Sequence, residues 1–118
     1  MADEKVLIVD DDPAIRKLLT KVVENNGFKS MTAANGQEAV ALAQNRKFDL
    51  ILLDIMMNGV DDGFDAIRNL RATGNDIPIV ILSGRTEDFD TLYGLDIGAD
   101  DYITKPFNPV VLGAKIKA

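Results

Sequence analysis

The chain has 118 residues, a length that fits one folded domain, and 47% of them are hydrophobic, which is enough to build a core. Its net charge of −6 argues against direct binding to nucleic acid, because such binding needs a basic surface. The lack of Cys excludes disulfides and thiol chemistry, and the lack of His excludes a histidine base and a phosphohistidine of the chain's own.

The N-terminal residues lead directly into the first predicted strand, Lys5–Asp10, which contains the apolar run "VLIV". A continuous apolar run is typical of a strand that is covered on both faces. The sequence contains neither a signal-peptide core nor a run of membrane-spanning length. We therefore expect a cytoplasmic protein that does not bind membranes.

The first predicted helix follows this strand. Asp12 is expected to be its N-cap and Pro13 its first residue, while Gly27 follows its end. Taken alone, Asp12 therefore fits a helix cap better than a metal ligand. Apolar residues with helical spacing form one apolar stripe: Ile15, Leu18, Leu19, Val22 and Val23.

Strands and helices continue to alternate along the chain. A second strand, Lys29–Ala33, precedes a helix whose start is predicted by Asn35 and Glu38, which resemble a capping box. The other predicted strands are Leu50–Asp54, Ile77–Leu82 and Asp101–Thr104. The other predicted helices are Phe64–Arg71, one that starts near Thr86 with Phe89, Leu92, Tyr93 and Leu95 on its apolar side, and one that Asn108 and Pro109 open.

Alternating strands and helices predict an α/β fold with a parallel sheet, right-handed crossovers and helices on both faces. Such a sheet carries its functional site at the carboxyl ends of its strands. The polar residues expected at that edge are Asp10, Asp11, Asp12, Asp54, Ser83 and Lys105.

Asp54 is the most informative of these residues, because it ends a hydrophobic run and burial of an unpaired carboxylate costs several kcal/mol. Carboxylates a few Å apart also repel each other unless a cation compensates their charge. Mg²⁺ prefers oxygen ligands and can be bound by one or two carboxylates with room left for a phosphate. We therefore predict a solvent-open Mg²⁺ site with Asp54 next to Lys105.

At this point the sequence resembles the CheY-like receiver domains of two-component response regulators, over essentially its whole length. The matching segments are "VLIVDDDPAIR", "LILLDIMM", "IVILSGR" and "GADDYITKPF". The resemblance implies a flavodoxin-like (βα)5 fold, a doubly wound sheet with the strand order 2-1-3-4-5. The last segment is similar to the OmpR/PhoB type, in which a receiver precedes a winged-helix DNA-binding domain. Residues 1–118 are thus expected to be the receiver at the N-terminal end of a longer regulator.

The resemblance also implies a reaction. Asp54 would accept a phosphoryl group from a phosphohistidine of a sensor histidine kinase or phosphotransfer protein, in a Mg²⁺-dependent phosphorelay. Asp10 and Asp11 would form the acidic pair, with Asp11 as a direct Mg²⁺ ligand, and Met56 would add its backbone carbonyl. Lys105 would neutralise charge on the transferring group. The domain is then no enzyme, apart from catalysing its own phosphorylation and dephosphorylation.

A switch is implied in addition. The Ser83 hydroxyl would move toward the acyl phosphate, and Tyr102 would rotate into the space that this opens. The fourth helix, fifth strand and fifth helix would change as a result. In similar regulators two copies of this face associate on activation through ion pairs. Here Thr91 and Val111 stand at the two positions of one such ion pair. Lys115 stands at the position of an Arg that would face Asp100 or Asp101. We therefore expect at most a weak homodimer.

The sequence departs from the family pattern near the site as well. In "DIMMNGVDDGF", Asn58 stands where Pro is usual, and one extra residue precedes Gly63. Gly84 stands where Ala is usual, which should loosen the loop next to Ser83.

Two other classes of function remain as alternatives. A haloacid-dehalogenase-type phosphatase also uses an Asp after a hydrophobic strand, but it needs a second Asp two residues later, where Met56 stands here. A receiver-fold interaction module that works without phosphorylation is the other alternative, and the complete set of acceptor residues argues against it.

Overall fold

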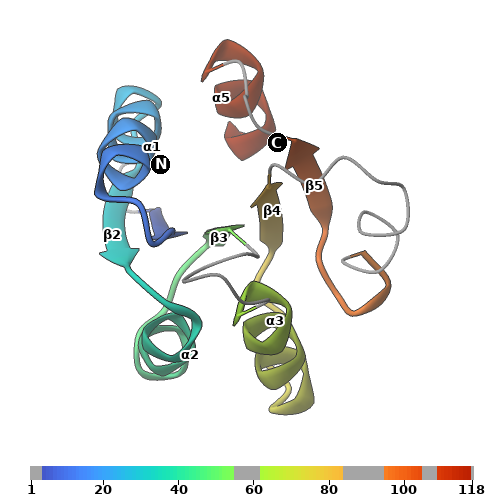
Figure 1. Ribbon diagram of the computed structural model, residues 1–118. Helices are drawn as coiled ribbons and strands as arrows, with labels where there is room; N and C mark the ends of the chain where they lie inside the picture. Colours follow the sequence, from blue (N-terminus) through green and yellow to red (C-terminus); the bar gives the residue numbers. More distant parts are fainter. Residues whose placement is uncertain (1–3, 55–61, 84–94, 105–108, 118) are drawn as a thin grey trace.

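The computed structural model of the chain describes residues 4–54, 62–83, 95–104 and 109–117. Its sheet has five strands in the order β2-β1-β3-β4-β5, and all neighbouring strands are parallel (Figure 1). The predicted strand order is therefore confirmed. The strands are β1 (Lys5–Val9), β2 (Lys29–Ala33), β3 (Leu50–Asp54), β4 (Ile79–Ser83) and β5 (Asp101–Thr104).

Helices cover both faces of the sheet, with α1 and α5 on one side and α2 and α3 on the other (Figure 1). Their bounds are α1 (Pro13–Asn25), α2 (Gly36–Asn45), α3 (Asp62–Ala72) and α5 (Pro109–Lys117). Most of the helix predicted from Thr86, including Phe89, Leu92 and Tyr93, lies outside the described residues. Leu95 is described, and it is 39% exposed.

Alternation along the strands divides the buried side chains into two cores. In β3, Leu50 and Leu52 belong to the core beneath α1 and α5, whereas Ile51 and Leu53 belong to the core beneath α2 and α3. We call these the α1/α5 core and the α2/α3 core. Because both faces are covered, β3 is buried along its whole length, as its continuous apolar run predicts.

Two strand boundaries differ from the predictions. The strand predicted over Ile77–Leu82 begins at Ile79 and ends at Ser83. Pro78 precedes it and has no N–H to donate to a neighbouring strand, although its carbonyl accepts the Ile51 N–H at 2.9 Å. The first strand ends at Val9, one residue before Asp10, whose N–H still donates to the Ala33 carbonyl at 3.2 Å.

The helix signals near α1 are confirmed, with one exception. The Asp12 carboxylate accepts the Ala14 N–H at 2.9 Å, and Pro13 is the first helical residue. Gly27 has φ +89° and its N–H donates to the Glu24 carbonyl, which ends the helix. The exception is Leu18, which is 42% exposed, because it lies at the edge of the stripe whose centre, at Leu19, faces the sheet.

The N-terminus of α2 also follows its sequence signal. The Asn35 side chain accepts the Glu38 N–H at 2.8 Å, as a capping residue does. The Glu38 carboxylate reaches back to the Ala34 N–H at 3.3 Å, one residue before the position that a standard capping box uses.

Arg71, near the end of α3, ties this helix to the segment before β5. Its guanidinium donates to the Gly98 carbonyl at 2.7 and 3.0 Å and pairs with the Asp100 carboxylate at 3.3 Å. Asp100 also accepts the Ile79 N–H at 2.8 Å, at the start of β4. Asp100 thereby joins the end of α3 to the start of β4.

Within the described part of the chain, no helix combines the length and the apolar character needed to cross a membrane.

Candidate functional site

The central strands β1 and β3 bring two of the predicted acidic residues together. Val9 and Leu53 are partners in the β1–β3 register, so Asp10 and Asp54 are the next pair at the carboxyl ends of these strands. Both continue the alternation of side chains that belong to the α1/α5 core, such as Ile8 and Leu52. The sequence therefore places two carboxylates on the same face of the sheet at its centre.

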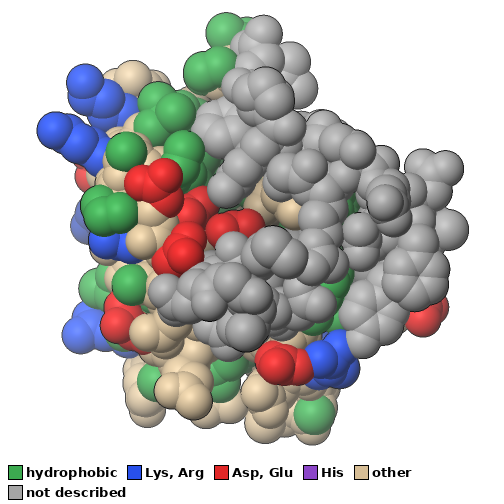
Figure 2. Space-filling view, viewed as in Figure 1, with side chains coloured by type: hydrophobic (Ala, Val, Ile, Leu, Met, Phe, Trp, Pro, Cys, Tyr) green, Lys and Arg blue, Asp and Glu red, His purple; other side chains and the backbone are tan. Residues whose placement is uncertain are grey.

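Asp10, Asp11 and Asp54 form one acidic cluster, in which a carboxylate oxygen from each lies within 4.8 Å of the others. Asp10 is only 1% exposed and Asp54 only 6% exposed. Acidic side chains are seen gathered near the centre of the face in Figure 2. Three carboxylates so close together repel one another unless a cation compensates, and their oxygens are the ligands that Mg²⁺ prefers. The residue types and their spacing thus fit a hard divalent cation.

Asp12 lies next to this cluster but has a different role. Its carboxylate caps α1, and its own N–H donates to the Asp10 carboxylate at 3.0 Å. The prediction that Asp12 is a helix cap is therefore confirmed.

Arg16 contacts the same turn and was not among the residues singled out from the sequence. Its guanidinium donates to the Asp10 backbone carbonyl at 2.7 Å. Sequence inspection alone offers a weak signal for this bond, namely an Arg in the second turn of a helix that starts at an acidic turn. Residue type does not reveal a bond to a backbone atom six residues earlier.

The two predicted switch residues also share a face of the sheet. Tyr102 pairs with Ile81 in the β4–β5 register, and Ser83 lies two residues after Ile81. Ser83 is 1% exposed, while Tyr102 is half-buried and packs against the α2/α3 core. Ser83 is also one residue past Leu82, the register partner of Asp54. The two side chains therefore lie on one face near the carboxyl end of the sheet, and their coupling stays a prediction.

Several sequence predictions fall on residues outside the described ranges. Lys105 and Met56 belong to this group, as do Gly84 and the loop that contains Asn58. Lys105 follows Thr104, the last residue of β5, which pairs with Ser83. Its expected position next to Asp54 therefore stays a prediction, as does the contribution of the Met56 carbonyl.

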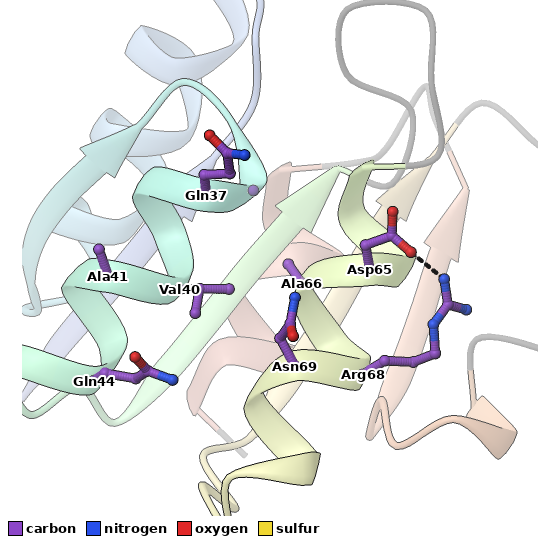
Figure 3. A pocket seen from close by; sticks show the side chains of 9 residues that line it. Gln37, Val40, Ala41, Gln44, Asp65, Ala66, Arg68 and Asn69 are labelled. Carbon is purple, nitrogen blue, oxygen red and sulfur yellow. Dashed lines mark hydrogen bonds and ion pairs between the residues drawn. The ribbon is translucent and has the colours of Figure 1, made fainter.

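A separate groove of about 570 Å³ lies between α2 and α3 and shares no residue with the acidic cluster (Figure 3). Carboxamide and aliphatic side chains line much of it, including Gln37, Val40 and Asn69. Its carboxylate, Asp65, forms an ion pair with Arg68 on the same helix. Asp65 is the one carboxylate among the lining residues of the groove, and it is already paired. The groove therefore lacks the concentration of acidic oxygens that distinguishes the cluster.

Comparison with known proteins gives a consistent result. Residues 6–117 match the model of the response regulator receiver domain. The chain is 44% identical over its whole length to the transcriptional regulatory protein YvrH of Bacillus subtilis, covering 49% of that protein. It is 41% identical to the alkaline phosphatase synthesis transcriptional regulatory protein PhoP of the same organism, over 98% of this chain and 48% of that protein. The chain thus spans about half the length of these curated relatives.

Solved structures agree with the sequence comparison. The receiver domain of Francisella response regulator 1452 has a TM-score of 0.91 and 34% identity, over 98% of this chain and 94% of that one. The chemotaxis protein CheY4 of Vibrio cholerae has a TM-score of 0.89 and 34% identity, over 98% and 97% of the two chains. With this fold, the acidic cluster at its carboxyl edge and the match over residues 6–117, the chain belongs to the response regulator receiver domain family.

Proposed function

We propose that this domain accepts a phosphoryl group on Asp54 from a phosphohistidine of a sensor histidine kinase or phosphotransfer protein. The observation that carries the proposal is the burial of Asp54 at the end of a central strand, with its carboxylate within 4.8 Å of those of Asp10 and Asp11. A structural role alone gives no reason to place three like charges there, since each raises the cost of the others.

In the proposed reaction an Asp54 carboxylate oxygen attacks phosphorus, so that a P–O bond forms and the P–N bond to the partner's imidazole breaks. The imidazole leaves with the electron pair of the broken bond and takes up a proton. Asp10 and Asp11, with the Met56 carbonyl, would hold Mg²⁺, which when bound neutralises charge on the phosphoryl oxygens. Lys105 would contribute a second positive charge, since phosphoryl transfer depends mainly on positioning and electrostatics.

Ser83 and Tyr102 would report the modification. A hydroxyl at the end of β4 can donate to a phosphoryl oxygen on the neighbouring strand, and movement of Ser83 would change the space available to Tyr102. Their shared face of the sheet supports this coupling. A local change in charge would thereby shift the conformational equilibrium of the region around β5 and α5.

The proposal extends to the whole protein of which this domain would be a part. Residues 1–118 would be the receiver of a longer, DNA-binding regulator, since the matched relatives are about twice as long and two are named as transcriptional regulators. The receiver itself would bind no nucleic acid. Its cytoplasmic location stays a prediction from the sequence.

Intact mass after incubation with acetyl phosphate and Mg²⁺ tests the proposal. The wild type should gain one phosphoryl group, Asp54→Asn should gain none, and Asp76→Asn should behave like the wild type because Asp76 is an exposed carboxylate outside the cluster. An adduct of the same mass on Asp54→Asn would contradict the assignment. No adduct on the wild type would favour an interaction module, and multiple turnover of phosphate esters would favour a phosphatase.

A further inference from the structure

Arg16 makes a contact for which the phosphoacceptor chemistry gives no reason. It lies in the second turn of α1, where its side chain is half-buried, and it donates from a guanidinium nitrogen to the Asp10 carbonyl at 2.7 Å. A bond from a charged donor is shorter and stronger than one between neutral groups. The contact therefore ties the helix to the residue at which β1 ends.

Asp10 is held from three directions. Its N–H donates to the Ala33 carbonyl at the end of β2, at 3.2 Å. Its carboxylate accepts the Asp12 N–H at 3.0 Å, and its carbonyl accepts the Arg16 guanidinium. Since the backbone is fixed on both sides of the side chain, the direction of the Asp10 carboxylate is fixed too. Asp11 follows directly and takes its orientation from the same peptide unit.

The choice of acceptor atom matters for metal binding. Arg16 binds a backbone carbonyl, so this bond occupies none of the carboxylate oxygens that could bind a cation. An arginine that paired with a carboxylate of the cluster would compete with the metal for that oxygen. The bond from Arg16 thus orients the acidic turn without using a carboxylate oxygen of the cluster.

We propose that Arg16 is a positioning residue for divalent-cation binding, which it supports by fixing the peptide between Asp10 and Asp11; this inference rests on the function proposed above. Outer residues that orient metal ligands typically change metal affinity by about 10–100-fold when they are replaced. Because Arg16 acts on the backbone of two ligands together, its replacement should weaken Mg²⁺ binding about tenfold.

The sign of the effect separates positioning from simple electrostatics. A guanidinium near a metal site repels Mg²⁺, so loss of its charge alone would tighten binding. Loss of orientation would weaken binding. Weaker binding after removal of Arg16 is therefore the result that only the positioning role predicts.

Calorimetric titration of metal-free protein with Mg²⁺, at fixed ionic strength, measures this effect. Arg16→Met should bind Mg²⁺ about tenfold more weakly than wild type. Arg16→Lys should lie between the two, because an ammonium group supplies one charged donor to the same carbonyl. Lys17→Met is the matched control, since Lys17 is the next residue of α1, is exposed and carries the same charge. It should leave the affinity unchanged.

Thermal unfolding of the metal-free variants provides the second readout. A merely structural role would lower the melting temperature of Arg16→Met with no change in its Mg²⁺ affinity, and that result would overturn the proposal. Equal or tighter Mg²⁺ binding by folded Arg16→Met would overturn it as well. If Arg16→Met does not fold, Arg16→Gln decides by the same criterion, because its shorter side chain keeps a polar end but loses the charge and the reach.

The failure of this inference is distinguishable from failure of the proposed function. If wild type binds Mg²⁺ and is phosphorylated on Asp54 while Arg16→Met titrates like wild type, only the role of Arg16 is wrong. If wild type neither binds Mg²⁺ nor gains a phosphoryl group, the function itself is wrong.

Discussion

At the scale of single residues, Asp11 and Asp12 show how neighbouring carboxylates take different roles. Asp11 contributes an oxygen to the acidic cluster, whereas the Asp12 carboxylate accepts the Ala14 N–H and caps α1. The sequence predicted this division because Pro13 marks the start of the helix and hence the capping position. It could not predict the bond from Arg16 to the Asp10 carbonyl, which depends on the path of the backbone between β1 and α1.

Replacement of each carboxylate should separate metal binding from stability. Asp11→Ala should greatly weaken Mg²⁺ binding, since it deletes one oxygen ligand from a small set. Asp12→Ala should leave Mg²⁺ binding nearly unchanged and lower the free energy of unfolding by about 0.5–2 kcal/mol through loss of the cap. Calorimetric Mg²⁺ titration and urea unfolding measure the two quantities. Equal losses of Mg²⁺ affinity in both variants would show that the roles are assigned incorrectly.

Lys105 is a further residue whose proposed role is chemical. Lys105→Ala should slow phosphorylation by acetyl phosphate, because it removes a charge expected next to the transferring group. The melting temperature of the metal-free protein should change little. The rate is measured by intact mass over time, with wild type and Lys17→Ala in parallel. Normal phosphorylation together with a large fall in melting temperature would assign Lys105 to the fold instead.

At the scale of elements, periodicity predicted most of the strands and helices, because burial on both faces requires continuous apolar runs in the strands and apolar stripes in the helices. The errors are local. A stripe is defined by residue type, whereas burial depends on the direction from which the helix meets the sheet, and so Leu18 is 42% exposed while Leu19 is 1% exposed. The start of β4 was misplaced because the apolar run includes Ile77, which precedes Pro78.

These adjacent leucines give a matched test of α1 packing. Leu19→Ala should lower the free energy of unfolding by about 2–5 kcal/mol, since it leaves a cavity in the α1/α5 core. Leu18→Ala should cost less than about 1 kcal/mol because much of its side chain is already in water. Urea unfolding measures both values. Equal costs would mean that α1 is rotated relative to the sheet described here.

Two glycines with positive φ test the contact between α3 and the segment before β5. Gly27→Ala should cost about 1–2 kcal/mol for the left-handed backbone alone, since a Cβ there meets nothing within 4 Å. At Gly98, with φ +126°, a Cβ would lie 2.7 Å from the Arg71 Cγ. Gly98→Ala should therefore cost about 1–3 kcal/mol more, as Arg71 must move away from the Gly98 carbonyl. The difference between the two variants in urea unfolding is the measurement, and a zero difference would contradict the described contact.

At the scale of the whole molecule, charge and shape are consistent with a small acidic domain whose fold and family were both predicted. The radius of gyration over the Cα atoms is 12.8 Å, and the net charge is −6. The fold was predictable because alternating strands and helices permit few arrangements. Self-association was less predictable, since an interface depends on surface side chains that the fold does not dictate.

We predict that the unphosphorylated domain is monomeric and that activation produces at most a weak dimer. Thr91 lies outside the described residues, as do the side chains of Val111 and Lys115, so the argument is that of the sequence: one usual ion pair lacks both partners. Exposed ion pairs contribute only about 0–1 kcal/mol each but determine register and partner choice. Sedimentation with and without beryllofluoride and Mg²⁺ measures the association.

The dimer prediction has its own control. Val111→Glu should weaken any dimer that forms on activation, because it places a charge at an expected apolar contact. A tight dimer in both states, or an affinity that Val111→Glu does not change, would show that a different face pairs.

The strands that carry the acidic cluster, β1 and β3, are each hydrogen-bonded to a neighbour on both sides. Such strands exchange their amide hydrogens mainly when the whole domain unfolds, whereas edge strands and chain ends open far more often. The amides of Leu53 and Asp54 should therefore be among the slowest to exchange with solvent. Local opening of the strand would therefore rarely expose a phosphoryl group on Asp54 to solvent. The lifetime of the proposed phosphorylated state would then be set by hydrolysis or back-transfer of the acyl phosphate in the folded site.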